Sequence, residues 1–148
     1  MNPNNEIEIL LVEDNQDDLD MALYALSQAK VANHIHVLRD GQEALDYIFC
    51  RGPQAGRTFA DAPNVILLDL KLPKVDGLEV LRAIKADPRT RTIPVVMLTS
   101  SQEQSDVVES YKVGVNSYIV KPVGFEQFTA AVQKLGLYWL LLNEKHKS

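Results

Sequence analysis

The sequence predicts an α/β fold in which a doubly wound, parallel five-stranded sheet carries helices on both faces. Five apolar stretches alternate along the chain with segments of helical periodicity, and this alternation is the pattern of that fold class. Three of the stretches, residues 7–12, 65–70 and 93–99, are nearly continuous apolar runs rich in Val, Ile and Leu. Such runs are typical of parallel strands that are buried on both faces.

Each predicted strand is followed by a predicted helix. The strands cover residues 7–12, 34–38, 65–70, 93–99 and 117–120, and the helical patterns cover residues 17–30, 41–49, 77–86, 105–114 and 124–143. The first three helices have apolar stripes at helical spacing, namely Leu19, Ala22, Leu23 and Leu26, then Ala44, Leu45, Ile48 and Phe49, then Leu78, Leu81 and Ile84. The fourth helical pattern is weak and the fifth is long. Residues 50–64 contain two prolines and two glycines without periodicity, which predicts a long loop.

The composition is that of a globular protein of one domain. The 148 residues are 46% hydrophobic and 24% charged, which is enough for one substantial core. The formal net charge of −5 argues against a nucleic-acid-binding surface, which needs a basic stripe. The N-terminus does not resemble a signal peptide, no apolar run approaches the ~20 residues that span a bilayer, and the single Cys50 cannot form an internal disulfide. We therefore expect one cytoplasmic domain over residues 1–148 that binds neither nucleic acid nor a membrane.

Polar residues stand where four of the predicted strands end. Glu13 and Asp14 follow the first strand, Asp69 ends the third, Thr99 ends the fourth and Lys121 follows the fifth. Taken singly, such residues also cap helices, end β-branched strands or lie in solvent. The C-terminal ends of parallel strands lie at one edge of the sheet, where ligands bind. The coincidence of these five residues therefore predicts a functional site.

The chemistry of this predicted cluster points to phosphoryl transfer. Two carboxylates about 4 Å apart repel by roughly 4 kcal/mol at an effective dielectric constant near 20, so they require a cation or a proton. A small set of hard oxygen ligands selects Mg²⁺. An aspartate beside that metal can attack phosphorus and form an acyl phosphate. Mg²⁺, the Lys121 ammonium and the Thr99 hydroxyl would stabilise the charge of the transferred group.

Four motifs together resemble the receiver domain of two-component response regulators. These are ILLVEDN, VILLDLKLPKVDGLEVL, IPVVMLTS and SYIVKP, which occur in the family's order within residues 7–137. The resemblance implies a flavodoxin-like (CheY-like) fold with strand order 2-1-3-4-5. It also implies phosphotransfer from a histidine kinase to an aspartate, which makes the protein a phosphoacceptor rather than an enzyme.

The resemblance also assigns roles to the residues of the metal and phosphoacceptor site. Asp69 corresponds to the phosphoacceptor. Glu13 and Asp14 correspond to the acidic pair that binds Mg²⁺ together with Asp69 and the backbone carbonyl of Lys71. The first acidic residue is more often Asp in the family, so the resemblance leaves open whether Glu13 contacts the metal directly or through water.

Further roles concern the switch that responds to phosphorylation. Thr99 corresponds to the switch hydroxyl, Tyr118 to the aromatic switch residue and Lys121 to the lysine that pairs with the phosphoryl group. The family also has a cis peptide bond before the proline that here is Pro122. Phosphorylation is expected to shift the population of two states and remodel the face formed by helix 4, strand 5 and helix 5.

The C-terminal residues 138–148 extend beyond the expected receiver core and are too few for an output domain. Residues 137–142, LYWLLL, cannot all face the sheet from one helix, so they either fold back on the domain or pack against a second copy. We favour a homodimer through helix 4, strand 5, helix 5 and the extension, with Tyr118, Phe125, Tyr138 and Trp139 in the interface. The loop, the length and the apolar tail together resemble the small response regulators paired with cyanobacterial phytochromes, which implies a phytochrome-type kinase.

Two other functions remain open from the residues alone. A Mg²⁺-dependent phosphohydrolase with an aspartate nucleophile would need a second aspartate in the DLK segment and a substrate pocket. A receiver-fold interaction module that is never phosphorylated would have no need of Asp14, Asp69, Thr99 and Lys121 together. Outside the site, His34 and His36 share a strand face without a third ligand near in sequence, which predicts surface or satisfied histidines rather than metal ligands, and Cys50 is expected to be inert.

Overall fold

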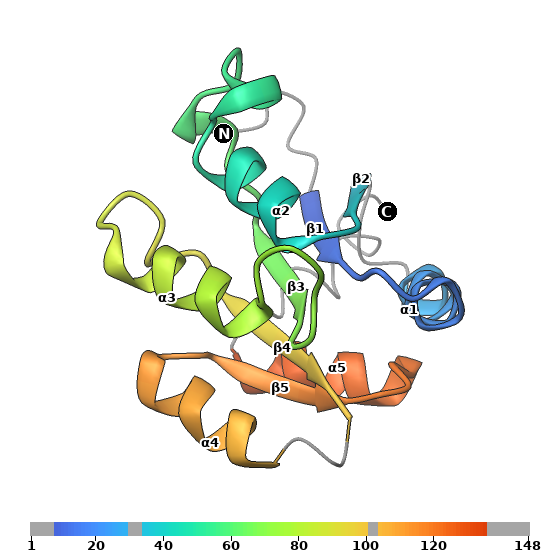
Figure 1. Cartoon of the computed structure of the whole chain (residues 1–148). Helices are drawn as coiled ribbons and strands as arrows, with labels where there is room; N and C mark the ends of the chain where they lie inside the picture. Colours follow the sequence, from blue (N-terminus) through green and yellow to red (C-terminus); the bar gives the residue numbers. More distant parts are fainter. Residues whose placement is uncertain (1–7, 30–33, 101–103, 136–148) are drawn as a thin grey trace.

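The computed structural model describes residues 8–29, 34–100 and 104–135 (Figure 1). Five parallel strands form one sheet: β1 (Glu8–Val12), β2 (His34–Leu38), β3 (Val65–Asp69), β4 (Val95–Thr99) and β5 (Ser117–Val120). Their order across the sheet is β2-β1-β3-β4-β5, so the predicted fold class and strand order are confirmed. The prediction that residues 1–148 form one domain is not tested by this arrangement.

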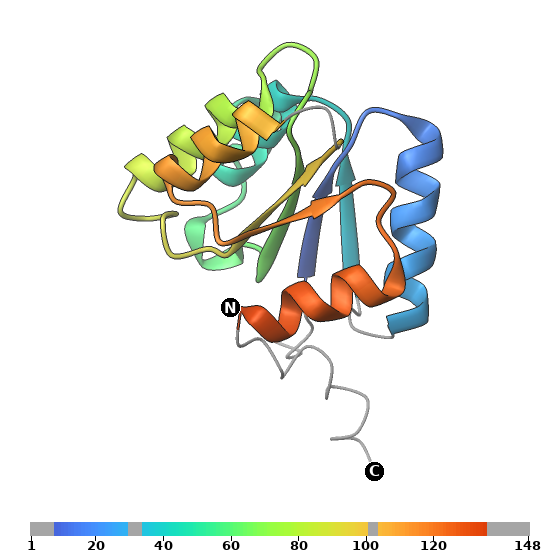
Figure 2. The same ribbon diagram turned by 90° about the horizontal axis from the view of Figure 1, so that it is seen from below.

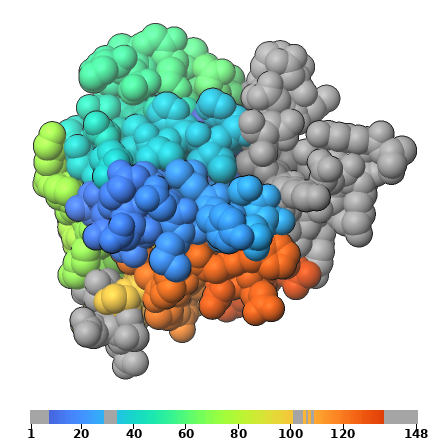
Figure 3. Space-filling model, turned by 90° about the vertical axis from the view of Figure 1, so that its right-hand side faces the viewer, coloured from blue at the N-terminus to red at the C-terminus, as the bar shows by residue number. Residues whose placement is uncertain are grey.

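Five helices cover the two faces of the sheet. They are α1 (Gln16–Ala29), α2 (Gly41–Ile48), α3 (Gly77–Ala86), α4 (Gln104–Val113) and α5 (Phe125–Lys134). Helices α1 and α5 contact each other on one face, while α3 contacts both α2 and α4 on the other (Figures 1 and 2). Figure 3 looks onto the outer surface of α1, in blue, with the orange residues of β5 and α5 beside it. Within these described segments, no helix has the length and apolar character to cross a bilayer.

Successive side chains of the central strands point to opposite faces of the sheet and pack into two separate hydrophobic cores. Ile9, Leu11 and Leu67 pack with α1 and α5 in one core, whereas Leu10, Val12 and Leu68 pack with α2 and α3 in the other. All residues of β3 and β4 are buried, as expected for central strands with helices on both sides. The sheet is therefore fixed from both faces, and so is the edge at which its strands end.

The ends of several elements differ from the sequence prediction by one or two residues. Strand β4 begins at Val95 rather than at residue 93, because Pro94 has no N–H to donate to the sheet. Strand β3 ends at Asp69, one residue earlier than predicted. The predicted loop 50–64 contains two short 3₁₀ turns, η1 (Gly52–Gln54) and η2 (Phe59–Asp61). The predicted continuation of the last helix to residue 143 lies outside the described residues.

Asn15 caps the helix that follows β1. Its side-chain oxygen accepts a hydrogen bond from the backbone N–H of Asp18 at 2.9 Å, which satisfies one of the unpaired donors of the first turn of α1. The alternative in which Glu13 or Asp14 caps this helix is therefore wrong. Both acidic side chains remain available for the edge of the sheet.

Gly77 lets the start of α3 pack directly on the end of β3. A Cβ atom at this position would lie 2.1 Å from the carbonyl oxygen of Asp69 and 2.7 Å from that of Leu70. The backbone N–H of Gly77 donates to the Leu70 carbonyl at 3.0 Å. Only a residue without a side chain allows this approach, so Gly77 fixes the backbone directly beside Asp69.

Candidate functional site at the carboxyl edge of the sheet

Asp69 lies at the centre of this edge, as the last residue of β3. Strand β3 lies between β1 and β4, and Asp69 is opposite Leu98 in the register with β4. The next residue donates its N–H to the Leu98 carbonyl at 2.9 Å, which continues the strand pairing past the aspartate. Asp69 itself is only 2% exposed. The apolar residues before Asp69 therefore hold its carboxylate in a fixed and nearly dry position.

Lys121 brings together carboxylates from three parts of the chain. Its Nζ atom lies 3.1 Å from Oδ1 of Asp69, 3.2 Å from Oε1 of Glu13 and 3.1 Å from Oδ2 of Asp18. The backbone N–H of Lys121 donates to the Thr99 carbonyl at 2.7 Å, which ties the loop after β5 to the end of β4. The Lys121–Pro122 peptide bond is cis, as the resemblance implies.

Glu13, Asp14 and Asp69 form an oxygen cluster suited to a hard cation. Each offers a carboxylate oxygen, and these oxygens lie within 4.8 Å of one another. Glu13 is buried and its Oε2 accepts a hydrogen bond from the backbone N–H of Asn15 at 3.2 Å, whereas Asp14 is exposed. One exposed and two buried carboxylates give a cation access from solvent and a fixed set of ligands. The donor set fits Mg²⁺, which takes a few carboxylates and keeps several waters.

The electrostatics of the site favour the capture of a cation or a proton. Burial, together with the negative charge of Glu13, raises the pKa of Asp69 to about 7, although Lys121 opposes this rise. Burial disfavours the charged form of Lys121, but the carboxylates of Asp69 and Glu13 outweigh it and raise the pKa of this lysine above its ordinary value. Lys121 therefore stays cationic at neutral pH beside a carboxyl group whose ionised form is disfavoured by burial and by Glu13.

The switch residues predicted from the sequence lie on β4, which is next to β3, and on the edge strand β5 beyond it. Thr99 is 1% exposed at the end of β4, and its hydroxyl donates to the Ser100 carbonyl at 3.1 Å. Tyr118 lies on the exposed face of the edge strand β5, with its ring edge-on to that of Tyr111 at a centroid distance of 5.7 Å. Lys71 is exposed in the turn after Asp69.

The predicted interface residues are placed only in part. Phe125 begins α5 and is 43% exposed. Tyr138 and Trp139 lie outside the described residues.

Two contributors to the site were not predicted from the sequence. Asp18, on the first turn of α1, supplies the third carboxylate around Lys121. Arg39, which follows β2, donates from Nη2 to the carbonyl of Asp14 at 3.0 Å and from Nη1 to Oε1 of Gln16 at 3.1 Å. Asp18 is one of several acidic residues at the start of α1. Only the rotation of this helix about its axis decides which of them faces Lys121, and the sequence does not reveal that rotation. The Arg39 contact joins two loops that are distant in sequence.

Comparison with known proteins identifies the family of this site. The sequence profile described as "Response regulator receiver domain" matches residues 9–133. The chain is 44% identical over 132 residues to the probable methanogenesis regulatory protein FilR2 of Methanothrix harundinacea (strain 6Ac), which covers 89% of this chain and 83% of that protein. It is 39% identical over 132 residues to response regulator Rcp1 of Synechocystis sp. (strain ATCC 27184 / PCC 6803 / Kazusa), which covers 89% of this chain and 88% of that protein.

Solved structures with this fold give the same result. The bacteriophytochrome response regulator RtBRR matches with a TM-score of 0.83 and 55% identity, over 90% of this chain and 80% of that chain. The Mn²⁺-bound form of Rcp1 matches with a TM-score of 0.74 and 38% identity, over 90% and 94% of the two chains. The phosphorylated cyanobacterial phytochrome response regulator RcpA matches with a TM-score of 0.73 and 39% identity, over 93% and 94%. The chain belongs to the response regulator receiver domain family.

Proposed function

We propose that this receiver domain accepts a phosphoryl group on Asp69 from a histidine kinase and signals by a change of conformation or assembly. The observation that carries the proposal is the buried Asp69 carboxylate, held 3.1 Å from the Lys121 ammonium beside Glu13 and Asp14. Members of the family act as phosphoacceptor regulators rather than as enzymes that turn over a substrate. The residues that such chemistry requires converge here on one accessible edge of the sheet.

The proposed reaction is a displacement at phosphorus by the Asp69 carboxylate. One carboxylate oxygen forms a bond to phosphorus, and the bond from phosphorus to the kinase imidazole nitrogen breaks, with its electron pair passing to that nitrogen. Lys121 supplies a fixed positive charge for the phosphoryl oxygens. In this proposal the Thr99 hydroxyl, at the end of the neighbouring strand, turns from the Ser100 carbonyl toward the new phosphoryl group.

We propose Mg²⁺ as the cofactor, held by Glu13, Asp14 and Asp69 with the backbone carbonyl of Lys71. Receiver domains bind Mg²⁺ generally, and the related Rcp1 has been solved in a Mn²⁺-bound form. When bound, Mg²⁺ neutralises the clustered carboxylates and stabilises negative charge on the phosphoryl oxygens. The protein's own part is to hold these oxygen ligands within reach of one ion.

The proposed kinase is of the phytochrome type and acts in the cytoplasm. Support comes from two relatives, RtBRR and RcpA, whose names describe a bacteriophytochrome response regulator and a cyanobacterial phytochrome response regulator. The net charge of −5 also favours protein partners over nucleic acid. A phytochrome kinase labelled on its own histidine is therefore expected to transfer its phosphoryl group to this protein faster than a kinase of another sensor class does.

The decisive test of phosphorylation is the mass of the intact protein after incubation with Mg²⁺ and acetyl phosphate. The wild type is expected to gain one phosphoryl group per chain, and the adduct should be lost in base. The Asp69→Asn variant, which keeps the shape of the side chain, should gain none. Absence of an adduct on the wild type would exclude phosphorylation as the mechanism, and steady turnover of acetyl phosphate would support the phosphohydrolase alternative instead.

We further propose a homodimer through the face formed by α4, β5 and α5. Support comes from apolar side chains that stay exposed on β5 and beside it, with Tyr118 39% and Val120 43% exposed. β5 is an edge strand, and exposed apolar groups on such an edge usually mark an interface. Placing a charge there by Val120→Glu is expected to convert dimer to monomer in sedimentation experiments. Ala55→Glu, in the exposed loop after α2, is the matched control and should leave the dimer intact. A monomeric wild type would contradict the proposal.

A further inference from the structure

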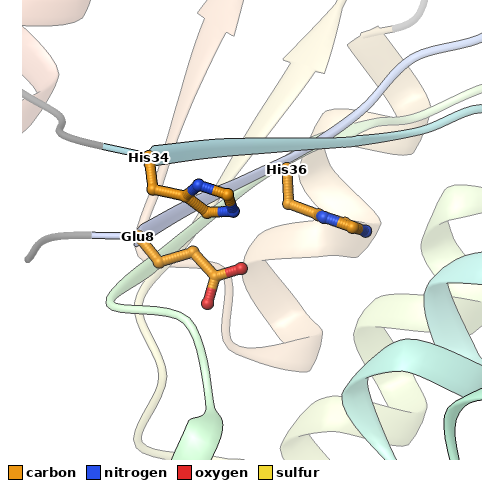
Figure 4. A group of neighbouring side chains, drawn as sticks. All are labelled: Glu8, His34 and His36. Carbon is orange, nitrogen blue, oxygen red and sulfur yellow. The ribbon is translucent and has the colours of Figure 1, made fainter. Parts of the chain in front are cut away.

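A second group of ligand-bearing side chains lies at the opposite edge of the sheet. Glu8 and His34 are the first residues of β1 and β2, and they are direct neighbours in the parallel register. His36 is two residues further along β2 and therefore projects from the same face. Figure 4 shows the three side chains leaving the two strands on one side and pointing into a common space. Glu8 lies about 16 Å along the chain from Glu13, so this group is separate from the Asp69 site.

The three side chains have the composition and spacing of a transition-metal site. One nitrogen of each imidazole and one oxygen of Glu8 lie within 4.8 Å of one another. Ligands of a tetrahedral Zn²⁺ ion, with bonds of about 2.0–2.1 Å, are about 3.3 Å apart, so small side-chain rotations close the set. Imidazole nitrogens favour Zn²⁺, Cu²⁺ or Ni²⁺ over the hard Mg²⁺. Two imidazoles and one carboxylate are a known three-ligand set for zinc with a position open to water.

Tyr47 on α2 orients two of the three ligands. Its hydroxyl donates a hydrogen bond to Oε2 of Glu8, and its ring stacks on that of His36 with a centroid distance of 4.4 Å. Tyr47 is only 5% exposed. The guanidinium carbon of Arg57 lies over its ring, 3.6 Å from the ring centroid. Outer contacts of this kind fix ligand orientation in metal sites. His34 is exposed, so an ion can reach the group from solvent.

We propose that Glu8, His34 and His36 form a binding site for one divalent transition-metal ion, with Zn²⁺ as the representative ion. The site connects the N-terminal halves of β1 and β2. Three protein ligands leave at least one coordination position for water or a further ligand. It is independent of the proposed phosphorylation of Asp69, because no residue is shared between the two sites.

The test is calorimetric titration of the full chain with Zn²⁺ in the presence of excess Mg²⁺, which occupies the carboxylates of the other edge. The wild type is expected to bind one Zn²⁺ per chain with micromolar affinity or better. The His34→Gln variant should bind at least about tenfold more weakly, since one of three ligands is removed. Tyr47→Phe keeps the ring but removes the hydroxyl from Glu8, and it should weaken binding by about tenfold.

An exposed carboxylate on another element offers a control. Glu79→Gln, on the outer surface of α3, removes a potential metal ligand outside the cluster and should leave Zn²⁺ affinity within twofold of the wild type. His34 is exposed, so His34→Gln is expected to keep the wild-type thermal unfolding in metal-free buffer. The proposal is overturned if the wild type binds no Zn²⁺ at micromolar concentration or if His34→Gln binds as tightly as the wild type. It is equally overturned if Asp69→Asn abolishes binding, because the ion would then occupy the other edge.

Discussion

Replacement of Lys121 by methionine is expected to lower the free energy of unfolding by about 3 kcal/mol in metal-free buffer at pH 8, because breaking a buried ion pair strands the remaining charges. Methionine keeps most of the side-chain volume and removes the ammonium. Glu13 and Asp69, whose side chains are 1% and 3% exposed, would then face each other without a cation. Urea unfolding in EDTA measures the loss, and adding Mg²⁺ should restore most of it.

Lys74 provides the matched control for this substitution. Its Nζ lies 3.5 Å from Oδ2 of Asp40, but its side chain is 68% exposed. Ion pairs exposed to solvent contribute at most about 1 kcal/mol, so Lys74→Met should change stability little. Equal losses for the two variants would mean that the contacts of Lys121 have no special role in holding the carboxylates together.

The Asp69→Asn variant is expected to be more stable than the wild type in metal-free buffer, and the difference should grow with pH. The pKa of Asp69 is about 7 in the folded protein against 3.8 for the ordinary side chain. Below pH 4 the carboxyl group is neutral in both the folded and the unfolded state, so it does not disfavour folding. Between pH 4 and pH 7 only the unfolded chain ionises, which destabilises the wild type by up to about 4 kcal/mol once pH 7 is passed. Asparagine carries no proton to lose and escapes this destabilisation.

Urea unfolding of both proteins at pH 4.5 and pH 8 in EDTA measures this effect. Asp20→Asn, a change at an exposed carboxylate of α1, is the control and should follow the wild type within about 0.5 kcal/mol at both pH values. Mg²⁺ at one hundred times its dissociation constant should stabilise the wild type by about 2.7 kcal/mol and leave Asp69→Asn nearly unchanged. A stability difference that is the same at both pH values would contradict the raised pKa of Asp69.

The edge of the sheet could be predicted from the sequence because each of its residues follows a recognisable strand. The apolar runs before Glu13, Asp69 and Thr99 mark the strands strongly, and parallel pairing then brings their ends together. No knowledge of distances is needed for this step. The same reasoning predicted the fold class, since apolar strand segments alternate with helix-period segments along the chain.

Contacts that depend on helix phase or strand register could not be predicted in this way. Asp18 lies beside Asp17 and Asp20, and only the rotation of α1 decides which carboxylate reaches Lys121. His34 and His36 were predicted to be surface or satisfied histidines because no third ligand is near in sequence, and Glu8 is 26 residues away from His34. The register that pairs Glu8 with His34 exists only once β1 and β2 are aligned. Both cases require knowledge of how neighbouring elements are set against one another.

The contacts of Lys121 also limit how its ammonium group can bind a further anion. A lysine ammonium has three N–H donors, and here three carboxylate oxygens, from Glu13, Asp18 and Asp69, lie within 3.2 Å of it. Its donor capacity is therefore already filled before any further anion arrives. An additional oxygen on Asp69 can be received only by exchange for an existing acceptor, and Asp18 is the least buried of the three. An anion that binds at the end of β3 would therefore compete with Asp18 for the Lys121 ammonium. Loss of this contact would change the environment of the first turn of α1.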